Sequence, residues 1–91
     1  MDITTKILKA AANERRVKVL RYLDGGGEKT VGEIAGHLRL SLTATSKHLS
    51  KLESVGLVKK RQEGLWVYYS INEDKSKRYN KVFMNFLRST R

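Results

Sequence analysis

The chain contains no cysteine and no proline. Without a thiol it can form no disulfide, no thiolate metal site and no cysteine nucleophile. Its longest apolar run is far too short to span a bilayer, and no basic-then-apolar leader opens it, so we expect an intracellular protein. Acidic residues are also scarce: 9 Asp and Glu stand against 19 Lys and Arg, for a formal net charge of +10. This charge indicates nucleic acid as the first candidate partner and an anionic membrane surface as the second.

A length of 91 residues leaves room for one small domain, and a hydrophobic content of 40% is enough for a core. A lone domain of this size is often marginally stable, so a partner that buries more surface is expected. No nucleophile–base pair or paired acid stands out, so we do not expect an enzyme. The two histidines, His37 and His48, are too few for a zinc site.

Four segments have apolar residues at helical spacing. In the second of these, the cations Arg15, Arg16, Lys18 and Arg21 are expected to face solvent. Gly25–Gly27 should interrupt the series, because three glycines cost too much backbone entropy inside a helix. The four expected helices cover about residues 2–12, 13–24, 31–38 and 42–55.

Helix-capping residues support these boundaries. Asn13 and Ser41 are expected N-caps, and Thr30 with Glu33 matches a capping box. Arg39-Leu40 then forms a tight turn between the third and fourth helices.

The remainder of the chain predicts a β-hairpin and a fifth helix. Strands are expected over 57–62 and 65–71, joined by Glu63-Gly64 as a two-residue loop. Asn72 would cap a last helix over 73–91. Glu73 and Asp74 would lie in its first turn, and Arg88 and Arg91 at its negative end.

The central unit has the pattern of a helix-turn-helix. A helix of about eight residues, a short turn and a longer helix with small polar residues and lysine outward suit a DNA major groove. The hairpin that follows carries Lys59, Lys60 and Arg61 and would be a wing against the sugar-phosphate backbone or the minor groove. The expected fold is therefore mainly α with a β-hairpin, a winged helix-turn-helix in the order α-α-α-α-β-β-α.

Five stretches of the chain together resemble the ArsR/SmtB family. They are Leu8–Leu20, Val31–Ala35, Ser41–Leu49, Gly56–Val58 and Glu63–Tyr69. The resemblance covers about residues 3–72. It implies a winged-helix homodimer that binds operator DNA and usually represses, with the first and last helices at the dimer interface. The apolar residues that fit this interface are Ile3, Ile7, Val82, Phe83, Phe86 and Leu87.

Departures from the family pattern remove some of the metal-sensing and DNA-contacting residues that other members have. Many members sense metals through a Cys-Val-Cys pair, but the matching positions are Thr30 and Gly32. Others use histidine ligands on the last helix, and residues 73–91 contain none. A wing position that is commonly basic in the family is Leu65, which cannot make the ionic contact of a basic residue there. A frequent glutamine of the recognition helix is Leu42, which would make only apolar contact, for example with a thymine methyl group.

Several alternatives remain open at this point. His48 can be a half-buried structural residue or a phosphate ligand. Trp66, Tyr68 and Tyr69 could stack on single-stranded bases, although strand alternation favours core packing of Tyr69, with Trp66 or Tyr68 covering the outer side. The last helix is amphipathic and could lie on a membrane, although a dimer core fits its spacing better. A winged-helix protein-interaction module, or a single-strand binder, is the alternative to a duplex-DNA regulator.

We therefore expect a single domain over 1–91, with 1–12 and 73–91 as terminal dimerisation helices. It would act as a homodimeric, cytoplasmic prokaryotic repressor, nucleoid-associated when bound to an inverted-repeat operator in double-stranded DNA. We expect no cofactor, no metal and no membrane partner, and the sequence does not identify an effector. The expected DNA contacts are Ser41, Leu42, Thr43, Thr45, Ser46, Lys47, His48, Ser50, Lys51, Lys60 and Arg61.

Overall fold

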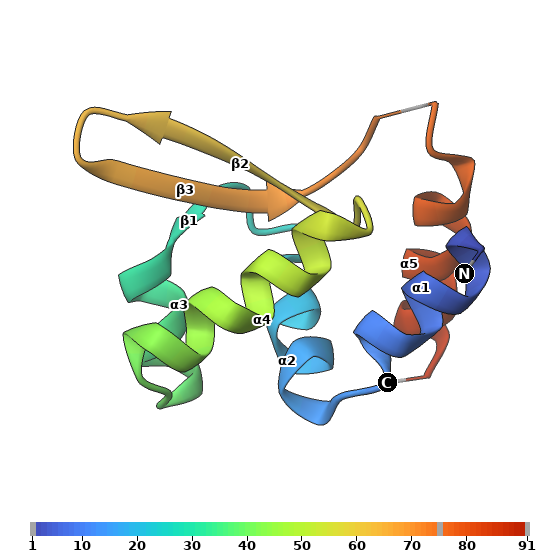
Figure 1. Cartoon of the computed structure of the whole chain (residues 1–91), viewed down its shortest axis with the longest axis horizontal. Helices are drawn as coiled ribbons and strands as arrows, with labels where there is room; N and C mark the ends of the chain where they lie inside the picture. Colours follow the sequence, from blue (N-terminus) through green and yellow to red (C-terminus); the bar gives the residue numbers. More distant parts are fainter. Residues whose placement is uncertain (1, 75, 91) are drawn as a thin grey trace.

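The structure is a computed structural model that describes residues 2–74 and 76–90. Within them, helices and strands follow the predicted order, with one additional short strand (Figure 1). The helices are α1 Ile3–Ala11, α2 Glu14–Leu23, α3 Val31–Leu38, α4 Leu42–Ser54 and α5 Arg78–Ser89. The strands are β1 Lys29–Thr30, β2 Val58–Glu63 and β3 Trp66–Ile71.

The predicted N-caps of α2, α3 and α4 are confirmed. The Asn13 side chain accepts hydrogen bonds from two backbone amides at the start of α2. Thr30 and Glu33 form the complete capping box, with reciprocal bonds of 3.1 and 3.0 Å. Ser41 Oγ accepts from the Ala44 amide at 3.0 Å. These bonds satisfy amides that the helices leave unpaired, which is why local sequence correctly located the starts of these three helices.

The sheet has the strand order β1-β3-β2, and all its pairs are antiparallel. Glu63 pairs with Trp66, so the hairpin loop is Gly64-Leu65, one residue later than predicted. Gly64 has φ of +59°, and a positive φ at the first loop position is the requirement that glycine meets in a type II′ turn. Strand β1 was not predicted, because two residues are too few to form a recognisable pattern.

The prediction that Asn72 caps the last helix is wrong. The Asn72 amide donates to the Leu57 carbonyl at 3.0 Å, and its side chain donates to the Gly56 carbonyl at 3.0 Å. These bonds extend the strand pairing, so the chain cannot turn into a helix there. Helix α5 begins only at Arg78, and Glu73 and Asp74 precede it. Lys75 and Arg91, which the predicted helix also included, lie outside the described residues.

One apolar core joins the five helices to the inner face of the sheet. Tyr69 and Ile71 are buried on β3, whereas Trp66 on the other face is exposed, as the alternation predicted. The fully buried apolar core side chains come from α2, α3, α4, the residue before β2 and the first residue of β2: Val19, Leu20, Leu23, Ile34, Leu49, Leu52, Leu57 and Val58.

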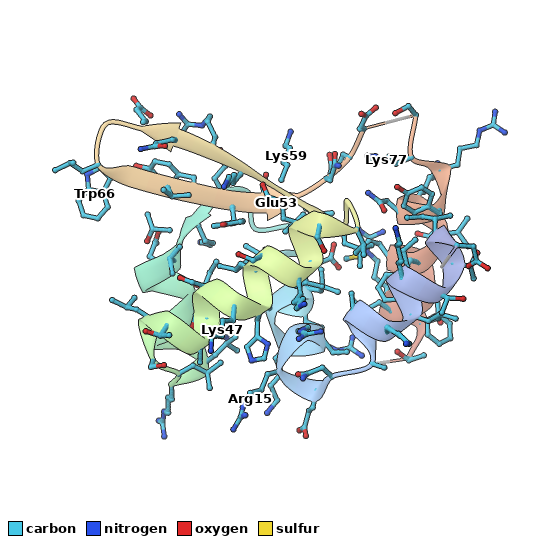
Figure 2. All side chains as sticks on the ribbon, in the orientation of Figure 1. Arg15, Lys47, Glu53, Lys59, Trp66 and Lys77 are labelled. Atoms are coloured by element: carbon cyan, nitrogen blue, oxygen red, sulfur yellow. The ribbon has the colours of Figure 1, made fainter. Side chains whose placement is uncertain are left out.

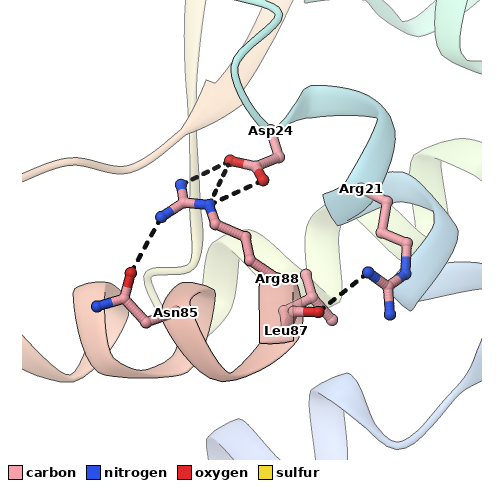
Figure 3. A network of polar contacts seen from close by, with 5 residues as sticks. All are labelled: Arg21, Asp24, Asn85, Leu87 and Arg88. Carbon is pink, nitrogen blue, oxygen red and sulfur yellow. Dashed lines mark hydrogen bonds and ion pairs between the residues drawn. The ribbon is translucent and has the colours of Figure 1, made fainter. Parts of the chain in front are cut away.

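Polar contacts fasten α5 to α2 (Figure 3). Arg88 binds both carboxylate oxygens of Asp24, at 2.6 and 2.9 Å. Arg21 donates to the Leu87 carbonyl at 3.0 Å, so this side chain is half-buried rather than solvated as predicted. Helices α1 and α5 thus lie at one end of the molecule, and the hairpin extends toward the other (Figure 1). No helix in the described residues is long and apolar enough to cross a membrane.

Candidate nucleic-acid interface

The helix-turn-helix is formed by α3, α4 and the turn between them. Arg39 adopts the left-handed conformation with φ of 56°, and the Leu40 amide donates to the Ala35 carbonyl at 3.0 Å. This pattern is a Schellman motif, which ends a helix within two residues. The turn lets α4 start immediately at its Ser41 cap and sets it across α3.

The outward side of α4 forms a shallow groove of polar and basic side chains, hereafter the α4 groove. No acidic residue is part of its lining. The small residues allow the helix backbone to approach a partner closely, and the two lysines can reach farther. The residues lining the α4 groove are Arg16, Leu42, Thr43, Ala44, Ser46, Lys47, His48, Ser50 and Lys51.

Thr45 does not belong to this surface. Its side chain is 0% exposed, and its hydroxyl donates to the Ser41 carbonyl at 2.8 Å. The predicted DNA contact from Thr45 is therefore incompatible with the structure, because this residue faces the core. Ser41 remains exposed, with its hydroxyl engaged in the α4 cap.

His48 lies at the edge of the α4 groove and is half-buried. Its Nδ1 accepts a hydrogen bond from Arg16 Nε at 3.2 Å. Burial, followed by the positive charges of Arg16 and Arg15, lowers the pKa of His48 from its ordinary value near 6.5. A neutral imidazole that accepts through Nδ1 carries its proton on Nε2, so His48 can donate one hydrogen bond from that atom.

Arg16 was predicted to be fully solvated, but it holds three helices together. Besides its bond to His48 on α4, its Nη1 donates to the Ala10 carbonyl at the end of α1 at 3.2 Å. The spacing of apolar residues gave no signal for this role, because the partners come from two other helices.

The wing carries Lys60 and Arg61, and both side chains form ion pairs with carboxylates. Lys60 lies 3.8 Å from Glu53 of α4. Arg61 makes hydrogen-bonded ion pairs with Glu28 at 2.9 and 3.0 Å and with Glu63 at 2.7 Å, and these bonds raise its pKa. Its guanidinium also stacks over the Tyr68 ring. These carboxylates therefore hold Arg61 on the wing and neutralise part of its attraction for DNA.

The end of the hairpin is apolar and solvent-exposed. Leu65 is 98% exposed and Trp66 is 63% exposed. Figure 2 shows Trp66 at the end of the hairpin, pointing away from the body of the molecule.

The residues of the predicted dimer interface differ in how far their side chains are exposed in the protomer. Ile7 and Leu87 are 6% and 4% exposed because they belong to the protomer's own core, so their assignment to the interface is wrong. The side chains of Ile3, Val82 and Phe86 are 45%, 69% and 62% exposed.

Phe83 is half-buried and its ring lies against that of Phe86. Leu8 on α1, which the prediction omitted, is 58% exposed.

No group of three or more potential metal ligands occurs among the described residues. Thr30 and Gly32, at the positions of the family's cysteine pair, lie at the start of α3, where Thr30 is the N-cap. His37 stacks on Tyr22 with the ring centroids 3.9 Å apart.

Two helices joined by a tight turn, the second with an exposed polar face, followed by an antiparallel hairpin, define the winged helix-turn-helix class of DNA-binding proteins. Comparison with known proteins places the chain further within this class. The profile of the family "Bacterial regulatory protein, arsR family" matches residues 13–60. The chain therefore belongs to the arsR family and is a DNA-binding transcriptional regulator.

Individual relatives agree with this assignment. A cadmium resistance transcriptional regulatory protein CadC homolog of Staphylococcus aureus is 35% identical, over 93% of this chain and 70% of its own length. The transcriptional activator HlyU of Vibrio cholerae is 42% identical, over 78% of this chain and 65% of its own length.

A solved structure also matches closely. It is the homodimeric winged helix-turn-helix DNA-binding domain of Mb0332 from Mycobacterium bovis, a possible ArsR-family regulator, with a TM-score of 0.79 at 35% identity. The match covers 93% of this chain and 78% of the Mb0332 fragment.

Proposed function

We propose that the chain is a homodimeric repressor that inserts α4 into the major groove of an inverted-repeat operator. The observation that supports this most strongly is the α4 groove, a surface of short polar side chains and lysines with no acid in its lining. A bound dimer would cover promoter DNA and hold the protein at the nucleoid. The chain would act as one domain over residues 1–91.

The residues of α4 would share the recognition. Thr43, Ser46 and Ser50 would contact base edges, and Lys47 would reach a guanine or a phosphate. Leu42, 61% exposed at the first turn of α4, would contact a thymine methyl group. Ser41, Lys51 and the Nε2 proton of His48 would bind the DNA backbone, as would the wing residues Lys60 and Arg61 once their carboxylate partners are exchanged.

Dimerisation would use the exposed apolar side chains of α1 and α5. Such side chains on two helices at one end of a small domain suit burial against a second copy. The protomer measures 32 × 26 × 25 Å along its principal axes. A twofold dimer on an inverted repeat requires its two α4 helices to lie about one DNA turn, roughly 34 Å, apart, a distance comparable to the length of the protomer.

Selection of bound sequences from a random duplex pool would test the proposal, followed by electrophoretic shift assays over a salt series. We expect a symmetric selected site and affinity that falls steeply with salt. Lys47→Ala should weaken binding by roughly tenfold or relax the preference at one base pair. Lys81→Ala, which removes the same charge from α5, should leave binding nearly unchanged.

Binding that ignores both the duplex sequence and Lys47→Ala would refute the role of α4. Preference for unpaired oligonucleotides, lost on Trp66→Ala, would instead support the single-strand alternative. In vitro transcription with the selected site would test repression, and increased transcript would show activation, the activity for which HlyU is named.

A further inference from the structure

A second groove lies beside the α4 groove, between α1 and the C-terminal half of α4. Its lining is basic and again contains no acidic residue. We call this surface the α1–α4 groove, and it is lined by Lys6, Lys9, Ala10, Arg16, Lys51, Ser54 and Val55. Arg16 and Lys51 also line the α4 groove, so the two grooves form one continuous surface.

The ammonium groups of the lysines in the α1–α4 groove are unpaired within the described residues. Among residues 2–74 and 76–90, the side chains of Lys6, Lys9 and Lys51 form neither a hydrogen bond nor an ion pair. Lys18, Lys60 and Arg61 elsewhere on the surface are each matched with a carboxylate. Uncompensated positive charge in a groove attracts anions, because low-dielectric walls concentrate its field.

Arg16 gives the α1–α4 groove a fixed geometry. Its bonds to the Ala10 carbonyl and to His48 Nδ1 hold α1 at a set position relative to α4. In the described part of the chain, its Nη2 makes no hydrogen bond. This guanidinium edge can therefore donate to an anion that occupies the groove.

We propose that the α1–α4 groove binds DNA phosphates and extends the interface beyond α4 and the wing. This inference rests on the proposed function. Lys6 and Lys9 of α1, with Arg16 and Lys51, would contact the backbone on the side of α4 away from the hairpin (Figure 1). Because α1 belongs to the proposed dimer seam, these contacts fall on the backbone between the two half-sites.

The groove suits phosphates better than bases. Its cationic groups are carried on long side chains, and its other lining residues are Ala10, Ser54 and Val55, which offer no bidentate pair for a base edge. The contacts would therefore add affinity and salt dependence without sequence preference.

The double variant Lys6→Gln/Lys9→Gln tests the proposal on the selected duplex. The logarithmic salt dependence of binding should fall by about 0.9 for each lost phosphate, hence by roughly 2 per protomer, and low-salt affinity should fall at least about tenfold. The matched control is Arg78→Gln/Lys81→Gln, which removes two exposed charges from α5. This control should retain the salt dependence of the unaltered chain.

A second measurement locates the contact. Uncharged methylphosphonates that replace the phosphates between the half-sites should weaken DNA binding by the unaltered chain and by the α5 control. They should weaken DNA binding by the α1 double variant much less. Lys51→Gln, on α4 and away from the proposed dimer seam, should lower the salt dependence by about 0.9 per protomer. Sedimentation of each variant would show that dimerisation is unchanged.

Equal salt dependence of the α1 double variant and the α5 control would overturn this inference and leave the role of α4 intact. An unaltered chain that binds no duplex at low salt would overturn the proposed function itself, and this inference with it.

Discussion

At the scale of single residues, Arg16 and His48 connect the scaffold to the interface. Arg16 donates to the end of α1 and to His48, which lies on the recognition helix. This arrangement requires a neutral imidazole, because a protonated Nδ1 cannot accept the bond from Arg16. The scaffold beneath the α4 groove therefore depends on the protonation state of one histidine.

Stability should consequently fall as the medium becomes mildly acidic. The pKa of folded His48 lies below its unfolded value near 6.5, so the unfolded chain binds the proton more readily. The stabilisation is complete above the unfolded pKa and is lost as pH falls toward the folded pKa. Urea unfolding at a fixed protein concentration should give a lower midpoint at about pH 5.5 than at about pH 7.5.

His48→Asn should flatten this dependence, since asparagine keeps an acceptor near the position of Nδ1 and does not titrate. His37→Asn is the matched control and should retain the dependence. Carboxylates whose pKa is lowered in the folded chain, such as Glu33, contribute little over this pH interval, because even their ordinary pKa near 4.5 lies below it. A wild-type midpoint that does not change over this pH interval would contradict the role of His48.

At the scale of elements, the wing is attached to the segment before α3. Glu28 precedes β1, and its carboxylate accepts hydrogen bonds from both Nε and Nη2 of Arg61 on β2. Strand β1 itself pairs with β3, through Lys29 opposite Tyr69 and Thr30 opposite Tyr68. The hairpin is thus held on one edge by β1 and across its outer face by the Glu28–Arg61 pair.

Glu28→Gln should release Arg61 toward DNA. The exposed ion pair is weak, so we expect an affinity gain of roughly two- to fivefold in low-salt shift assays. The gain should shrink as salt screens the charges. Glu73→Gln removes one exposed negative charge elsewhere and should give a smaller gain. Equal gains for the two variants would show that Glu28 does not restrain the wing.

Element positions could largely be predicted from local sequence, for identifiable reasons. Asn13, Thr30 and Ser41 cap helices with their own side chains, so their roles are visible within a few residues. The start of α5 was mispredicted because Asn72 bonds to Gly56 and Leu57, 16 and 15 positions earlier in the chain. Such long-range bonds override local capping preference.

At the scale of the whole molecule, exposed apolar surface identifies the proposed dimer seam. Phe86 and Val82 are more than half exposed on α5, and Ile3 and Leu8 are exposed on α1. Large apolar side chains grouped on two terminal helices expose apolar surface to water in a monomer, whereas a dimer can bury this surface. The solved Mb0332 domain is itself homodimeric.

Phe86→Asp should convert the dimer to a monomer. A carboxylate in an apolar seam would be unpaired and, by twofold symmetry, present twice, so dimerisation should weaken by more than about a hundredfold. The substituted residue is exposed in the protomer, so each copy should still fold. Sedimentation would measure the change, with Leu65→Asp at the hairpin tip as the matched control. A Phe86→Asp chain that remains dimeric would place the seam elsewhere.

The amino-acid sequence by itself determined the winged helix-turn-helix class, the starts of the first four helices and the outward-facing residues of α4, because caps and periodicity are local. Tertiary structure alone decided which of the predicted site residues are accessible to DNA or to a second copy. It buries Thr45 under Ser41, places Ile7 and Leu87 in the protomer core, and occupies Arg61 with carboxylates. It also brings Lys6 and Lys9 beside α4, since proximity between distant segments depends on helix packing that no local pattern records.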